Sequence, residues 1–143
     1  MPEISDGLII VAKRDCPTCV LLEPVYGELA ASGVALAVYS QDDPSFPATV
    51  DGVIDDTNLE ASYRLDIETV PTLIRMSGGK EVARIVGWEM REWRDFTGIG
   101  DLGDGLPDYR PGCGSLNVEP GMAETLAVRF GDTKLAARRI EIA

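Results

Sequence analysis

The chain has 143 residues, of which 45% are hydrophobic and 26% are charged. These values are typical of a soluble globular protein with one domain and a substantial core. The net charge of −11, from 13 basic and 24 acidic residues, argues against binding to nucleic acid or to an anionic membrane surface. The longest apolar runs are shorter than a membrane span, and the first residues lack a secretory signal pattern. We therefore expect a cytoplasmic protein.

The first predicted elements enclose two cysteines. The apolar run at residues 8–12 predicts a buried strand, and apolar residues spaced by three and four over 20–30 predict a helix. Cys16-Pro17-Thr18-Cys19 lies between them, with the proline suited to the first helical turn. Free backbone N–H groups and the helix dipole favour a thiolate at Cys16 there. Cys19 follows one turn later and can close a disulfide with it.

Three interpretations of this CxxC motif stay open. A strand, a CxxC motif and a helix in that order are typical of a redox-active pair. The alternatives are a structural disulfide and half of a zinc site. The chain has no histidine and no second CxxC motif, so a four-ligand zinc site would need carboxylates or another chain. We therefore expect no metal.

The following segments predict the rest of a sheet with helices. A β-branched run at 34–39 predicts a second strand, parallel to the first through a right-handed crossover. Acidic capping residues precede a short helix at 59–65. Runs at 69–76 and 81–87, joined by a glycine-rich turn, predict an antiparallel hairpin, and 88–96 predicts a further helix. The result is an α/β fold with a four-stranded mixed sheet flanked by helices.

Four features follow one another along residues 7–98: the CxxC motif after a buried strand, Pro24 five residues beyond the second cysteine, the segment at 63–72 that contains Pro71, and the hairpin that leads to Gly87. In their order and spacing, these features resemble the thioredoxin superfamily. The resemblance implies a thioredoxin-like fold. It also implies a thiol-disulfide oxidoreductase that acts on a disulfide-containing protein, is recycled by an external reductant and uses no organic cofactor.

The resemblance assigns roles to particular residues. Cys16 would attack the substrate disulfide, and Cys19 would resolve the mixed disulfide. Pro71 would be a cis-proline beside the CxxC motif, and the backbone of Val70 would pair with an incoming peptide like an added strand. Gly87 would complete this substrate groove.

Two positions depart from the superfamily pattern. Asp15 replaces the tryptophan that usually precedes the first cysteine, and its charge should oppose a thiolate unless Lys13 and Arg14 offset it. Ile10 replaces the buried acid that accepts a proton from the second cysteine. We therefore expect slower turnover than in a typical thioredoxin.

The last third of the chain lies outside the resemblance. We expect a domain boundary near residue 98, with a thioredoxin-like domain at 1–98 and a C-terminal extension at 99–143 packed on it. The extension begins with a Gly-, Asp- and Pro-rich segment and contains a short helix at 122–130. Its one cysteine, Cys113, lies between glycines and is either an accessory thiol for the CxxC pair or an incidental free thiol.

Three functions remain to be compared. The first is thiol-disulfide exchange by Cys16 and Cys19. The second is a protein-binding module of thioredoxin-like fold whose CxxC motif is idle or structural. The third is metal carriage by Cys16, Cys19 and Cys113.

Overall fold

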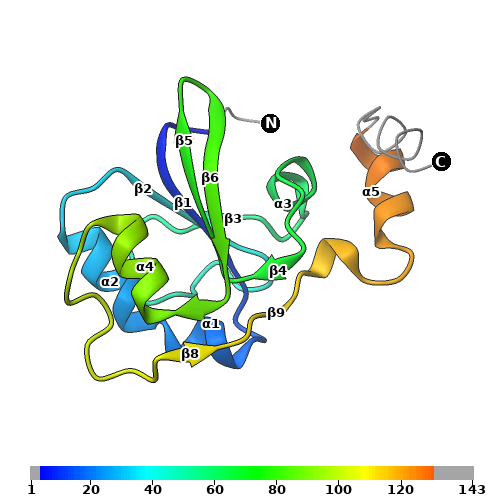
Figure 1. Ribbon diagram of the computed structural model, residues 1–143. Helices are drawn as coiled ribbons and strands as arrows, with labels where there is room; N and C mark the ends of the chain where they lie inside the picture. Colours follow the sequence, from blue (N-terminus) through cyan, green and yellow to red (C-terminus); the bar gives the residue numbers. More distant parts are fainter. Residues whose placement is uncertain (1–3, 131–143) are drawn as a thin grey trace.

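A mixed β-sheet forms the centre of the protein (Figure 1), whose computed structural model describes residues 4–130. The strands of this sheet are adjacent in the order β3-β2-β1-β5-β6. β1 runs parallel to β2 and antiparallel to β5, while β5 and β6 form an antiparallel hairpin. The strands are β1 (Gly7–Ala12), β2 (Leu36–Ser40), β3 (Ile54–Asp55), β5 (Thr72–Ser77) and β6 (Lys80–Val86).

The predicted α/β class is confirmed, and the sheet has one strand more than predicted. β3 is only two residues long and lies parallel to the end of β2. Both residues of β3 are exposed. Two exposed residues carry no hydrophobic alternation, so no pattern in the sequence predicted this strand.

Helices cover both faces of the sheet. In Figure 1, α2 and α4 lie on one side and α3 on the other. α1 and α2 are separated at the fully buried Leu22, and Pro24 lies in the first turn of α2, where its missing N–H costs no hydrogen bond. The helices are α1 (Pro17–Leu21), α2 (Glu23–Ala31), α3 (Glu60–Arg64), α4 (Met90–Thr97), α5 (Met122–Phe130) and the 3-10 turn η1 (Leu116–Val118).

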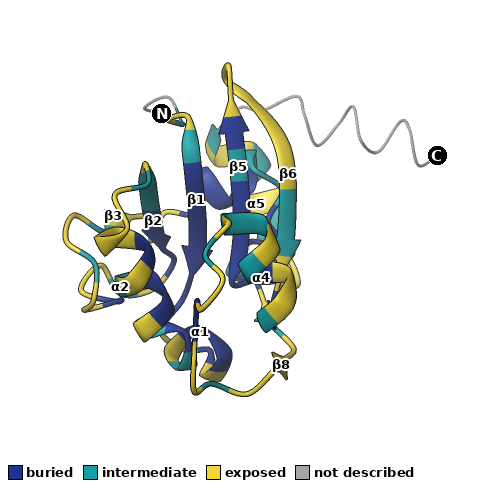
Figure 2. Cartoon of the chain, turned by 60° about the vertical axis from the view of Figure 1, so that its left-hand side comes forward, coloured by how far each residue is buried: buried dark blue, intermediate teal, exposed yellow. Residues whose placement is uncertain are grey.

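The core lies around β1, which is buried along most of its length (Figure 2). Trp88 and Trp93 are fully buried at one end of this core, with ring centroids 5.5 Å apart. The predicted helix at 88–96 begins later than expected, at Met90. Glu89 caps it by accepting a hydrogen bond from the N–H of Glu92, and Trp88 belongs to a short strand instead.

The described part of the extension packs on this core. Leu102 is fully buried in the main cluster, and Leu126 of α5 packs with Leu59 and Tyr63 near α3. The expected irregular segment holds two short strands, β8 (Tyr109–Arg110) on β7 (Trp88–Glu89) and β9 (Cys113–Gly114) on β4 (Thr69–Val70). The extension was predicted to run to residue 143, but residues 131–143 lie outside the described part.

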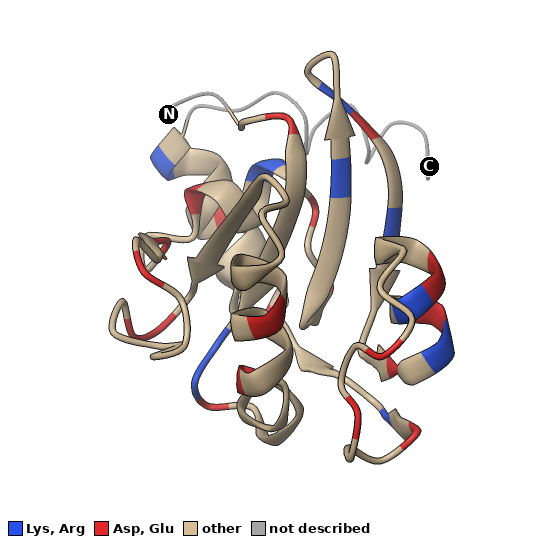
Figure 3. Ribbon diagram, turned by 90° about the vertical axis from the view of Figure 1, so that its left-hand side faces the viewer, with Lys and Arg blue, Asp and Glu red and all other residues tan. Residues whose placement is uncertain are grey.

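Acidic residues, coloured red on the ribbon of Figure 3, are spread over several loops and helices. Within residues 4–130, no helix has the length and apolar character needed to cross a membrane.

Candidate active site

The CxxC motif follows β1 and forms the start of α1. Cys16 is the N-cap of α1, and its Sγ accepts a hydrogen bond from the backbone N–H of Cys19 at 3.3 Å. Pro17 occupies the first helical turn. Both thiols are free and buried, with exposed fractions of 1% for Cys16 and 0% for Cys19. The fold therefore brings the two thiols together at a helix N-terminus.

Hydrogen bonds favour the thiolate of Cys16. The thiol of Cys19 makes the largest contribution, and together with the thiol of Cys113 and backbone N–H groups it lowers the pKa of Cys16 from 9.0 to about 6, against the opposing effect of burial. Burial, followed by the neighbouring Cys16, raises the pKa of Cys19. At neutral pH the site therefore holds one thiolate, on Cys16, and one thiol, on Cys19.

Lys13 and Arg14, the two bases that could offset the charge of Asp15, bind other groups. The guanidinium of Arg14 forms an ion pair with Asp43 at 2.6 Å, and Lys13 Nζ donates to the carbonyl of Gly114 at 2.8 Å. Hydrogen bonds from neighbouring groups lower the pKa of Cys16, with the thiol of Cys19 first among them.

Pro71 and Val70 lie directly beside Cys16. The Val70–Pro71 peptide bond is cis, and the thiol of Cys16 donates to the carbonyl of Val70 across 3.7 Å. A second cis peptide bond, Phe46–Pro47, was not expected from the sequence. The cysteine pair and the residue before Pro71 therefore form one continuous site.

Residues 111–115, here called the strap, cross this site. β9 within the strap pairs antiparallel with β4, so that Cys113 lies opposite Val70. On the other side, Thr18 Oγ1 donates to the carbonyl of Pro111 at 2.6 Å. The backbone edge that was expected to receive a substrate peptide is thus already paired with the chain's own strap.

Glycines permit the close approach of the strap. A Cβ on Gly112 would lie 2.7 Å from the carbonyl oxygen of Val70, and a Cβ on Gly87 would lie 3.1 Å from the nitrogen of Gly112. Gly87 also has a φ of +67°, which L-residues rarely adopt. The predicted site residue Gly87 therefore faces the strap.

A buried polar network holds the end of the strap. Gln41 Nε2 donates to Ser115 Oγ at 2.6 Å, and Ser115 Oγ also bonds Asn117 Oδ1. Asn117 Nδ2 donates to the carbonyl of Ile67 at 2.9 Å. Gln41, Ser115 and Asn117 are at most 5% exposed. Sequence reasoning missed these residues, because isolated polar residues in loops carry no spacing that would mark them as buried partners.

Comparison with known proteins places the chain in a family. A thioredoxin from Chlamydia pneumoniae is 30% identical over 93 residues, which make up 63% of this chain and 78% of that protein. The chain belongs to the thioredoxin superfamily. The crystal structure of a reduced thioredoxin pre-protein from Schistosoma mansoni is 21% identical and gives a TM-score of 0.47, over 65% of this chain and 78% of that chain. No family model matches the chain.

One buried polar group near the cysteines has no partner. Ile10, which replaces the buried acid of the superfamily pattern, is fully buried and offers no polar group. The hydroxyl of Tyr26 is also buried and makes no hydrogen bond. Burial, and then the charges of Cys19 and Cys16, raise the pKa of Tyr26 well above its usual value. Tyr26 is therefore a buried, neutral phenol.

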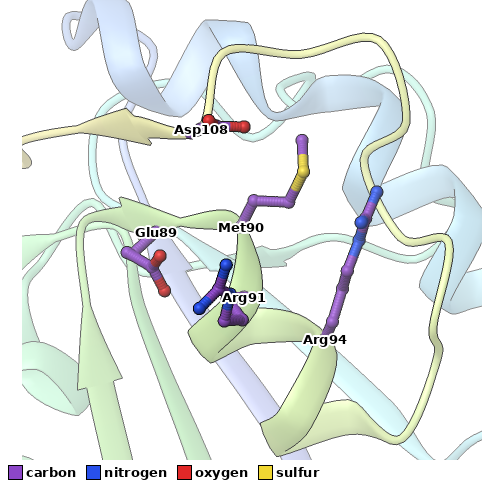
Figure 4. Close-up of a pocket in the computed structure, with 5 residues that line it drawn as sticks. All are labelled: Glu89, Met90, Arg91, Arg94 and Asp108. Carbon is purple, nitrogen blue, oxygen red and sulfur yellow. The ribbon is translucent and has the colours of Figure 1, made fainter.

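Outside the cysteine pair, the described residues of this thioredoxin-like protein hold pockets but no candidate metal centre. Between residues 4 and 130, no group of three or more His, Cys, Asp or Glu side chains could hold a metal ion, so the metal-carrying hypothesis gains no site there. Figure 4 shows a separate pocket of about 200 Å³ beside the start of α4, and none of the cysteines lines it. Its lining residues are Glu89, Met90, Arg91, Arg94 and Asp108.

Proposed function

We propose that this protein is a thiol-disulfide oxidoreductase in which Cys16 is the nucleophile and Cys19 the resolving thiol. The observation that carries the proposal is the position of Cys16 Sγ at the N-cap of α1, beside a second thiol and with a pKa lowered to about 6, first by the hydrogen bond from the Cys19 thiol. The thiolate is the reactive form of cysteine, so Cys16 is reactive at neutral pH, whereas Cys19 stays a thiol until the mixed disulfide has formed.

The two thiols act in sequence. The Cys16 thiolate attacks a disulfide and forms a mixed disulfide, and one substrate thiol leaves. Burial and the neighbouring Cys16 raise the pKa of Cys19. Bond formation removes the charge of Cys16, which makes deprotonation of Cys19 easier. Cys19 then attacks Cys16 Sγ and releases the second substrate thiol. An external reductant returns the pair to the dithiol.

The finer parts of this proposal concern substrate and setting. We assign the substrate side of the site to Val70, Pro71 and Gly87, and the substrate class to disulfide-containing proteins. Residues 1–98 would supply the thiol chemistry, and the extension at 99–143 would cover it. A reducing compartment such as the cytoplasm suits a pair that must be recycled to the dithiol.

A second candidate function rests on one observation. Cys16 is only 1% exposed, and the strap occupies the backbone edge of Val70. These features also suit a protein-binding module whose CxxC motif is idle or structural. The two candidate functions differ in whether Cys16 and Cys19 are repeatedly oxidised and reduced.

Insulin reduction with dithiothreitol as the electron source tests the choice. We expect the wild-type protein to accelerate the reaction, and Cys16→Ser to return it to the uncatalysed rate. Cys19→Ser combined with Cys113→Ser should accumulate a mixed disulfide with insulin, visible by mass spectrometry, because neither neighbouring thiol remains to resolve it. Tyr109→Ser is the control, since Tyr109 is 62% exposed and outside the strap. A wild-type rate equal to that of dithiothreitol alone would favour the binding module.

A further inference from the structure

Three thiols lie at this site, and their accessibility forms a gradient. Cys19 is 0% exposed and Cys16 is 1% exposed, whereas Cys113 in the strap is half-buried. A disulfide arriving from solvent therefore meets Cys113 before it can reach the CxxC pair. Cys113 is thus the most accessible of the three thiols, although the proposed function begins with attack by Cys16.

Backbone pairing fixes Cys113 next to Cys16. Cys113 lies opposite Val70 in the β4–β9 ladder, and the carbonyl of Val70 is the acceptor for the Cys16 thiol. Hydrogen bonds hold the strap on both sides of Cys113: Thr18 of the CxxC segment donates to Pro111, and Lys13, just before that segment, donates to Gly114. The thiol of Cys113 also helps to lower the pKa of Cys16, while burial, and after it the neighbouring Cys16, raise the pKa of Cys113.

The anchoring of the strap argues against a lid that swings away. Ser115 is fully buried and bonded to Gln41, and the N–H of Leu116 donates to Gln41 Oε1 at 3.1 Å. Removing the strap would leave these buried groups without partners, which costs more free energy than an exposed loop motion. The strap is therefore a fixed part of the site, and it contains Cys113.

We propose that Cys113 is a third redox thiol, which exchanges with external disulfides and relays electrons to them from the buried Cys16–Cys19 pair. The proposal rests on the proposed function of that pair and adds the route by which the pair reaches its substrate. It makes the strap part of the catalytic unit.

The relay balances as three exchange steps. Cys113 passes its proton to the Cys16 thiolate and attacks an external disulfide R–S–S–R′, forming Cys113–S–S–R, and the leaving R′ thiolate takes that proton from Cys16. The Cys16 thiolate then attacks Cys113 Sγ, forms a Cys16–Cys113 disulfide and releases the R thiolate. Cys19 passes its proton to the R thiolate and attacks Cys16 Sγ, which leaves Cys16–Cys19 oxidised and releases Cys113 as a thiolate. Cys113 then takes a proton from water. The external disulfide gains two electrons, which the Cys16–Cys19 pair supplies.

The intermediate disulfide gives the first test. Reduced Cys19→Ser is treated with glutathione disulfide, and its linkages are mapped by peptide mass spectrometry. The relay predicts a Cys16–Cys113 disulfide, because the third step is blocked. A variant that carries only glutathione on Cys16, with Cys113 free, would overturn the proposal. The wild type under the same treatment should end with Cys16–Cys19.

Rates give the second test. Reduced wild type, Cys113→Ser and the control Tyr109→Ser are mixed with glutathione disulfide, and formation of Cys16–Cys19 is followed after acid quenching. We expect Cys113→Ser to react at least about ten-fold more slowly, because the accessible thiol that attacks glutathione disulfide is gone. The control should react at the wild-type rate. An unchanged or faster rate in Cys113→Ser would overturn the relay and make the strap a cover. Thermal melting checks that Cys113→Ser is folded. If it is not folded, the disulfide linkages found in Cys19→Ser decide whether the relay operates.

If the wild type forms no Cys16–Cys19 disulfide at all, the proposed function fails rather than the relay alone.

Discussion

Two segments meet at the candidate active site, and they are held by different forces. The CxxC segment at residues 16–19 sits between a fully buried stretch of β1 and a helix whose inner residues are also buried. The strap is held by backbone pairing, by close glycine contacts and by buried hydrogen bonds to Gln41 and Asn117. Small polar changes should therefore loosen the strap while leaving the CxxC segment in place. The following predictions test that difference, from the largest expected effect to the smallest.

Asn117→Ala should give the largest loss of stability. Asn117 donates to the carbonyls of Ile67 and Ser62 and bonds Ser115, so its removal leaves several buried groups unsatisfied. We expect the free energy of unfolding to fall by about 2–4 kcal/mol, measured by urea denaturation of the reduced protein. The neighbouring Val118→Ala is the control, because Val118 is 50% exposed. Equal effects of the two changes would mean that the network does not hold the strap.

Gly112→Ala should separate the strap from β4. The new Cβ would lie 2.7 Å from the carbonyl oxygen of Val70, so we expect a loss of about 1–3 kcal/mol from overpacking. Alkylation of Cys16 by a bulky maleimide should become faster as the strap shifts. Gly114→Ala is a matched control two residues away, where a Cβ meets nothing within 4 Å. If both variants behave like the wild type, the strap does not lie against β4 in solution.

Cys113→Ala should raise the pKa of Cys16. The thiolate of Cys16 accepts hydrogen bonds from the thiols of Cys19 and Cys113, which help hold its pKa at about 6 instead of 9.0. Loss of this smaller contribution should raise the pKa of Cys16, and Cys19→Ala should raise it further, because the Cys19 thiol makes the largest contribution. Thiolate absorbance of the reduced proteins against pH measures both. A midpoint in Cys113→Ala equal to that of wild type would show that the strap thiol does not reach Cys16.

The same lowered pKa makes the stability of the reduced protein depend on pH. Because the folded pKa of Cys16 lies below its ordinary value of 9.0, first through the hydrogen bond from Cys19, the thiolate stabilises the fold at high pH. This contribution is complete above pH 9.0 and is lost as the pH falls through about 6. The dependence should be absent in Cys16→Ser, measured by denaturation at a series of pH values. A pH dependence that survives in Cys16→Ser would assign it to another group.

Tyr26→Phe should have the smallest effect. The hydroxyl of Tyr26 is buried without a hydrogen bond, so its removal leaves no partner unsatisfied. We expect the free energy of unfolding to stay the same or to rise by up to about 1 kcal/mol, measured by denaturation of the reduced protein. A clear loss of stability would show that the hydroxyl has a partner in solution.

The sequence predicted one side of the site better than the other, for physical reasons. The buried strand, the start of the helix at Cys16 and the hairpin after Pro71 follow from hydrophobic runs, capping preferences and turn residues, which are local patterns. β9 and β8 are two residues long, and their pairing depends on where a long irregular segment returns in space. Gln41 and Asn117 become partners of the strap only after that return. No local pattern in the sequence marks such contacts.

A redox titration of the wild-type protein tests the central claim most directly. The protein is equilibrated in thiol-disulfide buffers from fully reducing to fully oxidising, quenched with acid, alkylated and mapped by peptide mass spectrometry. We predict a single two-electron transition that ends in a Cys16–Cys19 disulfide, with Cys113 as a free thiol at the end point. Three free thiols in the most oxidising buffer would contradict a redox-active pair at the start of α1.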